Sequence, residues 1–260
     1  VYFEVSDPEK NDSIPIKLKN KKPSQLFETI IKIYELPSYH EMDLTPFVAF
    51  FYSIFFGFCL GDLGYGIVLF AVSFIGRFFA KGFLKKVFSI GIILGISTMI
   101  MGVLTGSGFG TDISKMRFFA PLKLFTSGEL FYLALLAGII QIIFAMILNI
   151  INIIKQDGVA ASFPTIGTIL SFIAFLALWS ISGNSYVLLS HLKIFAPVLP
   201  PISELQNYKL HIQIIFCFGV FLILFFNSPG LNIFLKPLNG LWLLYNIITG
   251  FLGDILSYIR

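Results

Sequence analysis

The stretch Leu130-Phe-Tyr-Leu-Ala-Leu-Leu-Ala-Gly-Ile-Ile-Gln-Ile-Ile-Phe-Ala-Met-Ile-Leu-Asn-Ile-Ile-Asn-Ile-Ile154 decides the fold class, because it contains no charged residue. A helix needs about 20 apolar residues to cross about 30 Å of hydrocarbon. This stretch is long enough to do so, and a water-soluble protein would have to hide all of its faces. We therefore interpret it as a transmembrane helix.

The composition of the whole chain agrees with this interpretation. Hydrophobic residues make up 57% of the sequence and charged residues 12%, and the mean hydropathy is +0.88. A soluble domain of this length needs a charged surface, so that class is excluded. The pI near 9.0 indicates basic residues at a membrane face rather than a nucleic-acid partner. Cys59 and Cys217 lie in apolar runs and predict neither a disulfide framework nor a metal site.

Further uncharged runs predict an all-α polytopic membrane protein with about seven transmembrane helices. The region 46–80 would form a helix of about 52 Å, which is too long for one crossing. The glycine-rich stretch 61–66 therefore predicts a tight hairpin of two short helices. The predicted crossings are residues 46–60, 65–80, 87–106, 130–154, 164–188, 209–227 and 240 onward.

Residues 1–45 are more polar than the rest and include a short amphipathic stretch, Gln25 to Leu36. We interpret them as the end of a cytoplasmic N-terminal domain with its linker, and 46–260 as the transmembrane domain. Most lysines and arginines fall in 1–45 and 77–86, which predicts a cytoplasmic N-terminus. A charged chain end inside an apolar helix would be costly, so we expect the natural protein to continue past both ends.

The last predicted helix carries a polar stripe that ends in an intramembrane charge. Steps of three and four residues back from the C-terminus fall within about 40° of one line on a helix. The stripe consists of Arg260, Ser257, Gly253, Thr249 and Asn246. Intramembrane charges usually mark ion or substrate pathways, and we favour that reading. The alternative is that Arg260 reaches an interface or pairs structurally with an acid such as Asp254.

Two other polar groups are candidates for a structural or vestibule role. In the stretch Gly61-Asp62-Leu63-Gly64-Tyr65-Gly66, Asp62 either caps the second hairpin helix or lines an aqueous vestibule, and we favour capping. The glycine spacing is not that of a nucleotide site. In the fourth predicted helix, interhelical hydrogen bonding is favoured over an ion path for three amides. These are Gln141, Asn149 and Asn152.

Four stretches, in order, resemble one family. They are Leu36-Pro-Ser-Tyr-His-Glu-Met-Asp-Leu-Thr-Pro-Phe47, Phe55-Phe-Gly-Phe-Cys-Leu-Gly-Asp-Leu-Gly-Tyr-Gly66, Leu104-Thr-Gly-Ser-Gly-Phe-Gly110 and Tyr245-Asn-Ile-Ile-Thr-Gly-Phe-Leu-Gly-Asp-Ile-Leu-Ser-Tyr-Ile-Arg260. They look like the entry hairpin, the third-helix exit and the seventh helix of the membrane subunit of V-type and A-type rotary ATPases. That subunit is called I in prokaryotes and a in eukaryotes, and this form looks prokaryotic.

The resemblance implies a domain of eight membrane helices, of which about seven lie within this sequence, in a prokaryotic plasma membrane. It implies a non-catalytic subunit without an ATP site, cofactor or metal. It also implies as partners the proteolipid ring, whose carboxylate would face Arg260, together with peripheral and central stalk subunits and membrane lipid. Some members carry an acid where this chain has Asn246.

Two other classes of function remain as alternatives. A secondary transporter would place broken helices in matching halves of the sequence, and only 61–66 resembles such a break. A structural membrane scaffold would leave the intramembrane arginine without a role. The sequence decides neither between H⁺ and Na⁺ nor between pumping and synthesis.

Overall fold

The computed structural model describes the chain in seven stretches, residues 16–34, 36–37, 41–118, 120–183, 202–228, 232 and 234–259. Within them, five helices are long and apolar enough to cross a membrane. These are α4 (Gly82–Thr105), α5 (Ser127–Asp157), α6 (Phe163–Ser182), α8 (Lys209–Phe226) and α9 (Lys236–Ile259). The predicted all-α membrane architecture is confirmed.

Two shorter apolar helices, α2 (Thr45–Leu60) and α3 (Leu63–Phe79), form the predicted hairpin. The chain turns between them at Gly61, whose φ of 42° lies in the left-handed region that favours glycine. A helix therefore accompanies each of the seven predicted crossings. The number of crossings itself stays a prediction.

Helix boundaries differ from the predicted crossings where local capping extends a helix. The helix α5 begins at Ser127 because Thr126 and Glu129 form a capping box. The helix α9 begins at Lys236, and Pro237 occupies its first turn, where the missing N–H of proline is tolerated. The predicted end of the fifth crossing, residues 184–188, lies outside the described residues.

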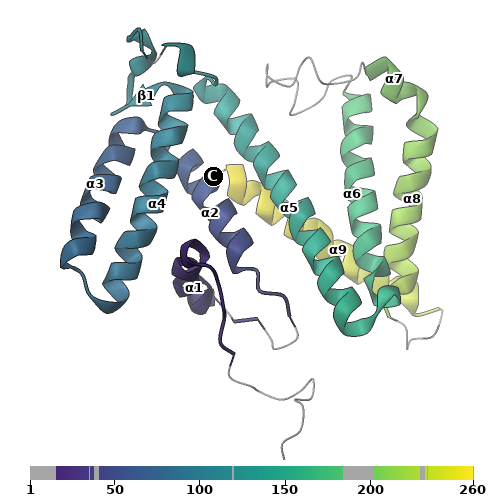
Figure 1. Ribbon diagram of the computed structural model, residues 1–260. Coiled ribbons are helices and arrows are strands. Elements are labelled where there is room, and N and C mark those ends of the chain that lie inside the picture. The colour runs from purple at the N-terminus through teal and green to yellow at the C-terminus, as the bar shows by residue number, and fades with distance from the viewer. Residues whose placement is uncertain are drawn as a thin grey trace, which may run out of the picture. The chain divides into compact units, whose positions relative to one another are not determined.

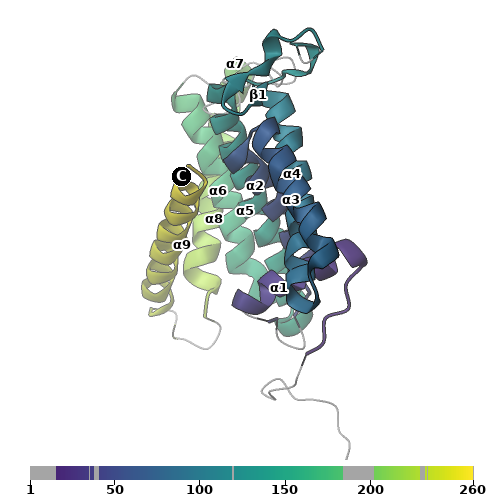
Figure 2. The same cartoon turned by 90° about the vertical axis from the view of Figure 1, so that its left-hand side faces the viewer.

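The chain divides into two compact units, residues 1–124 and 125–260. In the first, the amphipathic stretch forms α1 (Lys22–Tyr34), which lies across α2 and α4 rather than along them (Figures 1 and 2). Phe27 is 1% exposed and packs with Ile90 and Leu94 of α4. The boundary predicted at residue 45 stays a prediction, while α1 packs on the helices that follow it.

Small residues let α3 and α4 approach each other closely. A Cβ atom built on Gly95 would lie 2.8 Å from the backbone nitrogen of Phe70, and one on Gly66 would lie 2.7 Å from that of Met99. The tightest approach is at Gly102, where a Cβ would lie 2.0 Å from the nitrogen of Leu63. Packing through small residues is the usual way in which membrane helices associate.

A short polar loop follows α4. Two-residue strands, β1 (Ser107–Gly108) and β2 (Thr111–Asp112), pair antiparallel around a turn in which Phe109 and Gly110 have positive φ. Short 3-10 helices follow at η1 (Ile113–Lys115) and η2 (Ala120–Leu122).

The second unit consists of α5, η3 (Val159–Ser162), α6, α7 (Ile202–Asn207), α8 and α9. The helices α6 and α8 pack through a pair of glycines, since a Cβ on Gly167 would lie 2.5 Å from the carbonyl oxygen of Gly219. The helix α9 contacts both α8 and α5. Gly240, at its start, is buried against the backbone of Leu224.

Candidate functional site

One face of α9 packs inside its unit. The ring of Phe251 lies against Phe172 of α6, with ring centroids 4.8 Å apart. The ring of Tyr258 covers Gly138 of α5, where a Cβ would lie 2.5 Å from it. Ile247 and Ile255 are half-buried on the same side. This face is apolar and holds α9 to its neighbours.

The polar stripe occupies a different face of α9, and that face is open. Asn246, Thr249, Gly253 and Ser257 are all exposed. Among the described residues, no neighbouring atom lies within 4 Å of the position that a Cβ would take on Gly253. Asp254, beside the stripe, is exposed as well. The structure therefore separates a packing face from a polar face along one helix.

The hydroxyl groups of the stripe bind their own helix. Thr249 Oγ1 donates to the carbonyl oxygen of Tyr245 at 2.9 Å, and Ser257 Oγ donates to that of Gly253 at 2.8 Å. Such bonds satisfy a hydroxyl donor within an apolar medium and leave its lone pairs free to accept. Arg260 lies outside the described residues, so its place at the end of the stripe stays a prediction.

Asp62 lies in a second, closed polar site. It is the N-cap of α3, and its Oδ1 accepts from the backbone N–H of Tyr65 at 3.1 Å. This is the capping role that the sequence favours, and it satisfies one of the free N–H groups at a helix start.

The loop after α4 supplies three more hydrogen bonds to the same carboxylate. Phe109 N donates to Oδ1, and Gly110 N and Ser107 Oγ donate to Oδ2, each at 2.8 Å. Asp62 is only 4% exposed. Burial alone would raise its pKa, but the hydrogen bonds from Gly110, Tyr65, Ser107 and Phe109 together lower the pKa to about 2. The group is ionised at neutral pH and fully bonded.

The junction around Asp62 is closed by close packing. Thr105 Oγ1 donates to the carbonyl oxygen of Gly61 at 3.1 Å. The ring of Phe109 covers Gly64, where a Cβ would lie 2.4 Å away, and it meets the ring of Tyr65 edge to face. The turn between α2 and α3 and the loop after α4 thus form one rigid piece. The carboxylate faces this loop, and its bonds serve to hold two segments together.

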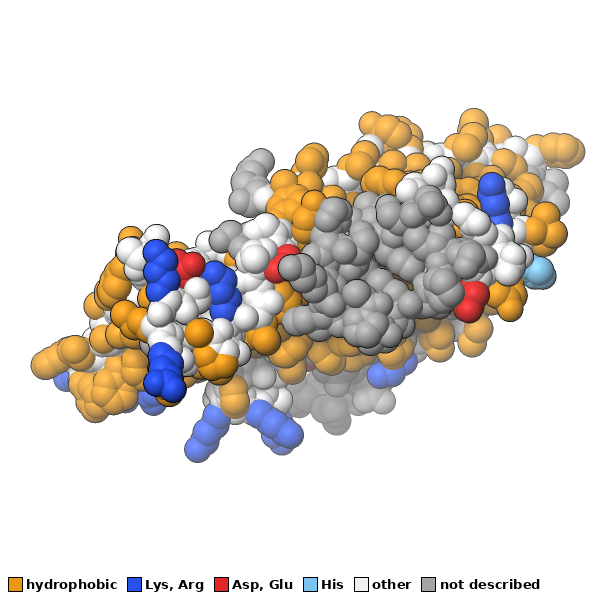
Figure 3. Space-filling model, turned by 90° about the horizontal axis from the view of Figure 1, so that it is seen from above, with side chains coloured by type: hydrophobic (Ala, Val, Ile, Leu, Met, Phe, Trp, Pro, Cys, Tyr) orange, Lys and Arg blue, Asp and Glu red, His pale blue; other side chains and the backbone are white. Residues whose placement is uncertain are grey.

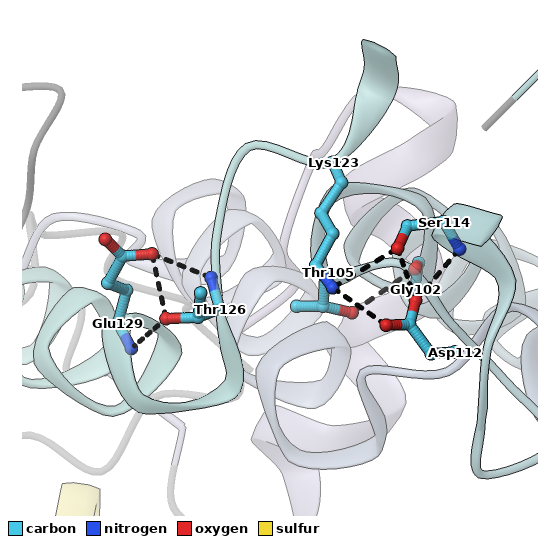
Figure 4. Close-up of polar contacts among 7 residues, drawn as sticks. All are labelled: Gly102, Thr105, Asp112, Ser114, Lys123, Thr126 and Glu129. Carbon is cyan, nitrogen blue, oxygen red and sulfur yellow. Dashed lines mark hydrogen bonds and ion pairs between the residues drawn. The ribbon is translucent and has the colours of Figure 1, made fainter. Parts of the chain in front are cut away.

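Farther along the same loop the charges are exposed. Lys123 Nζ reaches Asp112 Oδ2 at 3.2 Å and Ser114 Oγ at 3.4 Å (Figure 4). Hydrogen bonds from the Ser114 hydroxyl and N–H, followed by Lys123, lower the pKa of Asp112 to about 2. Figure 3 looks down on this end and shows basic and acidic side chains gathered over the loop.

The three amides of α5 do not act as one group. Asn149 is exposed, and Asn152 Oδ1 accepts from Gln156 Nε2 at 3.1 Å within the same helix. Gln141 Oε1 is buried and has no hydrogen-bond partner in the described part of the chain. The interhelical hydrogen bonds predicted for this stripe stay a prediction.

Sequence reasoning missed the partners that the loop gives to Asp62. Ser107, Phe109 and Gly110 lie about 45 positions away in the chain, and no periodicity connects them. A signal was available, because the two stretches 61–66 and 104–110 are both rich in glycine. Gly102 was also missed, since its role is defined only by the backbone that passes beside it.

Relatives of the chain share one name. A V-type ATP synthase subunit I from Borreliella burgdorferi is 28% identical over 99% of this chain, and an A-type ATP synthase subunit I from Methanocaldococcus jannaschii is 25% identical over all of it. An A-type ATP synthase subunit I from Pyrococcus horikoshii is 36% identical over 46% of the chain. No family model matches the sequence.

The chain is much shorter than these relatives. The matched part covers 42% of the Borreliella protein, 39% of the Methanocaldococcus protein and 19% of the Pyrococcus protein. The similarity therefore concerns less than half of each relative.

Proposed function

We infer that this homologue of subunit I of the A-type and V-type ATP synthases forms the ion-conducting membrane part of a rotary ATPase stator. The polar face of α9 would be turned toward a rotating ring of proteolipid helices. Ions would enter through one half-channel, bind a ring carboxylate, travel with the ring and leave through a second half-channel. The ATP chemistry would belong to other subunits.

The observation that carries this proposal is the difference between the two faces of α9. A helix face that meets lipid is normally apolar, whereas an exposed row that includes an amide side chain and a glycine is typical of a face that meets protein or water. Asn246, Thr249, Gly253 and Ser257 are such a row. A neighbouring protein surface or a water-filled path would provide contacts for these polar positions. In the proposal, the ring provides the protein surface and the half-channels beside it provide the water.

Each residue of the stripe has a definite role in this proposal. Arg260 would keep its charge in a poorly solvated place because a guanidinium group stays protonated at any physiological pH. A fixed positive charge lowers the pKa of a passing ring carboxylate and blocks direct ion leakage between the half-channels. Gly253 leaves room for the ring, and Asn246, Thr249 and Ser257 provide polar lining. Asp254 would join a half-channel beside the stripe.

The proposal includes the rest of the assembly. The N-terminus would lie in the cytoplasm of a prokaryote, and peripheral and central stalk subunits would bind the protein on that side of the membrane. The transported ion would be H⁺ or Na⁺, since the ring carboxylate selects it.

The direct test replaces Arg260 in the full-length subunit, assembled with its complex in vesicles. We expect Arg260→Lys and Arg260→Gln to abolish ATP-driven ion pumping while the complex still assembles. Arg117→Gln, which removes an exposed arginine from a loop, is the matched control and should pump normally. Coupled pumping by both Arg260 variants would refute the assignment.

Cysteine accessibility tests the open face separately. Cys59 and Cys217 are free, so both are first replaced by alanine. Single cysteines at Asn246, Thr249 and Ser257 should then react with a small water-soluble thiol reagent. Cysteines at Ile247 and Phe251, on the packed face, should not. Equal reactivity of the two sets would remove the support for a water path.

Co-purification distinguishes this proposal from the alternatives. A stator subunit should bring down a proteolipid ring and stalk subunits from the native membrane. A secondary transporter or a scaffold should not.

A further inference from the structure

The turn between α3 and α4 carries a cluster of exposed cations. Arg77 lies in the last turn of α3, Lys81 is the N-cap of α4, and Lys85 and Lys86 lie in the first turns of α4. All four side chains are exposed. The sequence from residue 63 to residue 111 contains no aspartate or glutamate, so neither helix supplies a counter-charge.

These four cations, called here the turn cations, have no partner in the described part of the chain. The ion pair recorded there joins Lys123 to Asp112 at the other end of α4, and no hydrogen bond in that part of the chain involves the charged side chains of the turn cations. Arg77, at the end of α3, meets favourable partial negative charge, but the three lysines at the start of α4 do not. The start of a helix carries partial positive charge, and Lys81 provides no side-chain cap. An anion at the turn would relieve this repulsion.

Large apolar side chains flank the turn cations. Phe78, Phe79 and Phe83 are 73%, 83% and 62% exposed. In water such rings would be a liability, but at a membrane surface they enter the acyl boundary while lysine and arginine reach outward to the headgroups. The turn joins two apolar helices, α3 and α4, so in a membrane that both helices cross it would lie at the depth where both contacts are available.

The helix α1 extends the same surface. It crosses α2 and α4 near this end of the unit, and Phe27 fixes it two turns into α4, against Ile90 and Leu94 (Figures 1 and 2). Its carboxylate Glu28 accepts from Asn20, so it is engaged locally. Five more lysines in and before α1 are exposed, namely Lys17, Lys19, Lys21, Lys22 and Lys32.

We propose that the α3–α4 turn, with α1 beside it, binds the anionic headgroups of membrane phospholipids. The unpaired cations bind the phosphate of the headgroup, and the exposed phenylalanine rings insert among the acyl chains beneath it. This places the end of the unit that carries the turn in the anionic leaflet. This lipid site is independent of the proposed ion pathway, because the turn lies in the first unit of the chain and α9 lies in the second.

The opposite end of the unit also carries exposed cations beside exposed apolar side chains, since Lys115 and Arg117 flank Met116, which is 61% exposed, but it has fewer unpaired cations. There Asp112 holds Lys123 at 3.2 Å, so part of the positive charge is already balanced. Lys115 and Arg117 are nevertheless exposed, which makes them a fair control for charge alone. A general attraction of cations to lipid would treat both ends equally. The proposal requires a preference for the α3–α4 turn.

The experiment measures lipid selectivity of the full-length subunit by native mass spectrometry. The protein is delipidated in detergent and offered equal amounts of phosphatidylglycerol and phosphatidylcholine. The test variant is Lys85→Gln/Lys86→Gln, and the control is Lys115→Gln/Arg117→Gln. Each surface cation favours anionic lipid by about fivefold, so the test variant, which removes two, should lose about 25-fold in preference for phosphatidylglycerol. The control should keep it.

A second variant separates the apolar contribution. Phe78→Ala/Phe79→Ala should reduce binding of both lipids alike and leave the ratio unchanged. Salt should lower the ratio for the parent protein, because about 1 M salt shortens the screening length to about 3 Å. Thermal melting of each variant confirms that it is folded.

Two results would overturn the proposal. One is an unchanged lipid ratio in Lys85→Gln/Lys86→Gln. The other is loss of another subunit from the purified complex of this variant, which would show that the turn contacts an acidic protein instead. Neither result depends on ion pumping, so the proposed function is tested independently.

Discussion

The Asp62 junction and the polar face of α9 are built from the same kinds of residue but meet opposite surroundings. Both combine glycine with hydroxyl and acidic side chains. At the junction, Asp62 is 4% exposed and accepts four hydrogen bonds. On α9, Asn246, Gly253 and Asp254 are exposed. Small and polar residues thus close one site inside the fold and leave the other free for a partner.

This difference teaches how the two glycine sets are used. A Cβ on Gly102 would lie 2.0 Å from the Leu63 nitrogen, so the glycine is needed by the unit itself. A Cβ on Gly253 would meet no atom of a described residue within 4 Å, so packing among those residues does not need that glycine. Gly253 therefore leaves space beside α9 that the proposed ring would occupy.

The largest expected effect on the stability of the subunit comes from breaking the hydrogen bonds of the Asp62 junction. Asp62→Ala leaves three N–H groups and the Ser107 hydroxyl without their acceptor, and each buried unpaired group costs about 1–3 kcal/mol. We expect destabilisation of at least about 3 kcal/mol, seen as a strongly lowered melting temperature of the subunit in detergent.

Asp112→Ala is the matched control for that change. Its carboxylate caps a turn in an exposed loop, where water replaces the lost partners. The melting temperature should hardly move. Similar losses in the two variants would contradict the view that burial distinguishes the sites.

The next effect comes from the paired glycines. Gly102→Ala forces a methyl group against the backbone of Leu63, and overpacking of this kind costs about 1–3 kcal/mol. Gly253→Ala should leave stability unchanged or raise it by up to about 1 kcal/mol, because alanine favours helix. The two variants are compared by thermal melting in the same detergent.

A larger substitution at Gly253 also tests the proposed function. Gly253→Leu should still fold, yet it should reduce ion pumping in the assembled complex if the ring passes this face. Normal ion pumping by Gly253→Leu would contradict the proposal that this glycine leaves room for the ring.

A smaller effect follows from the pKa of Asp62. Its value in the folded protein, about 2, is below the ordinary 3.8, so the ionised form is stabilised by folding. This contribution is complete above about pH 4 and is lost as the pH falls toward about 2. It amounts to about 2 kcal/mol.

Acid titration of stability checks this sign. The parent subunit should lose stability between about pH 4 and pH 2, and Asp62→Asn should lose less over the same interval because its side chain does not titrate. An unchanged acid profile in Asp62→Asn would contradict the lowered pKa.

The smallest expected effect is on the hydroxyls of α9. Thr249 and Ser257 bond only to carbonyls of their own helix in the described contacts, so Thr249→Val and Ser257→Ala should change stability by less than about 0.5 kcal/mol. A large loss of stability would mean that this face is packed. Pumping by these variants, in contrast, reports on the proposed path.

Local physics explains why much of the architecture was predictable. Hydrophobic length identified all seven helices that accompany the predicted crossings, and the glycines at 61–66 identified the hairpin turn. The cap of α3 was also predictable, because an N-cap bonds to an N–H three residues away. Helical periodicity placed Asn246, Thr249, Gly253 and Ser257 on one face.

The sequence by itself therefore determined the membrane class, the helices and the existence of a polar stripe, since each depends on neighbours within a few residues. Only the tertiary structure decided that Ser107, Phe109 and Gly110 complete the bonding of Asp62, and that Gly253 faces open space. Those facts depend on which distant backbone lies alongside. Periodicity gives the face of a helix, and packing alone shows whether that face is covered.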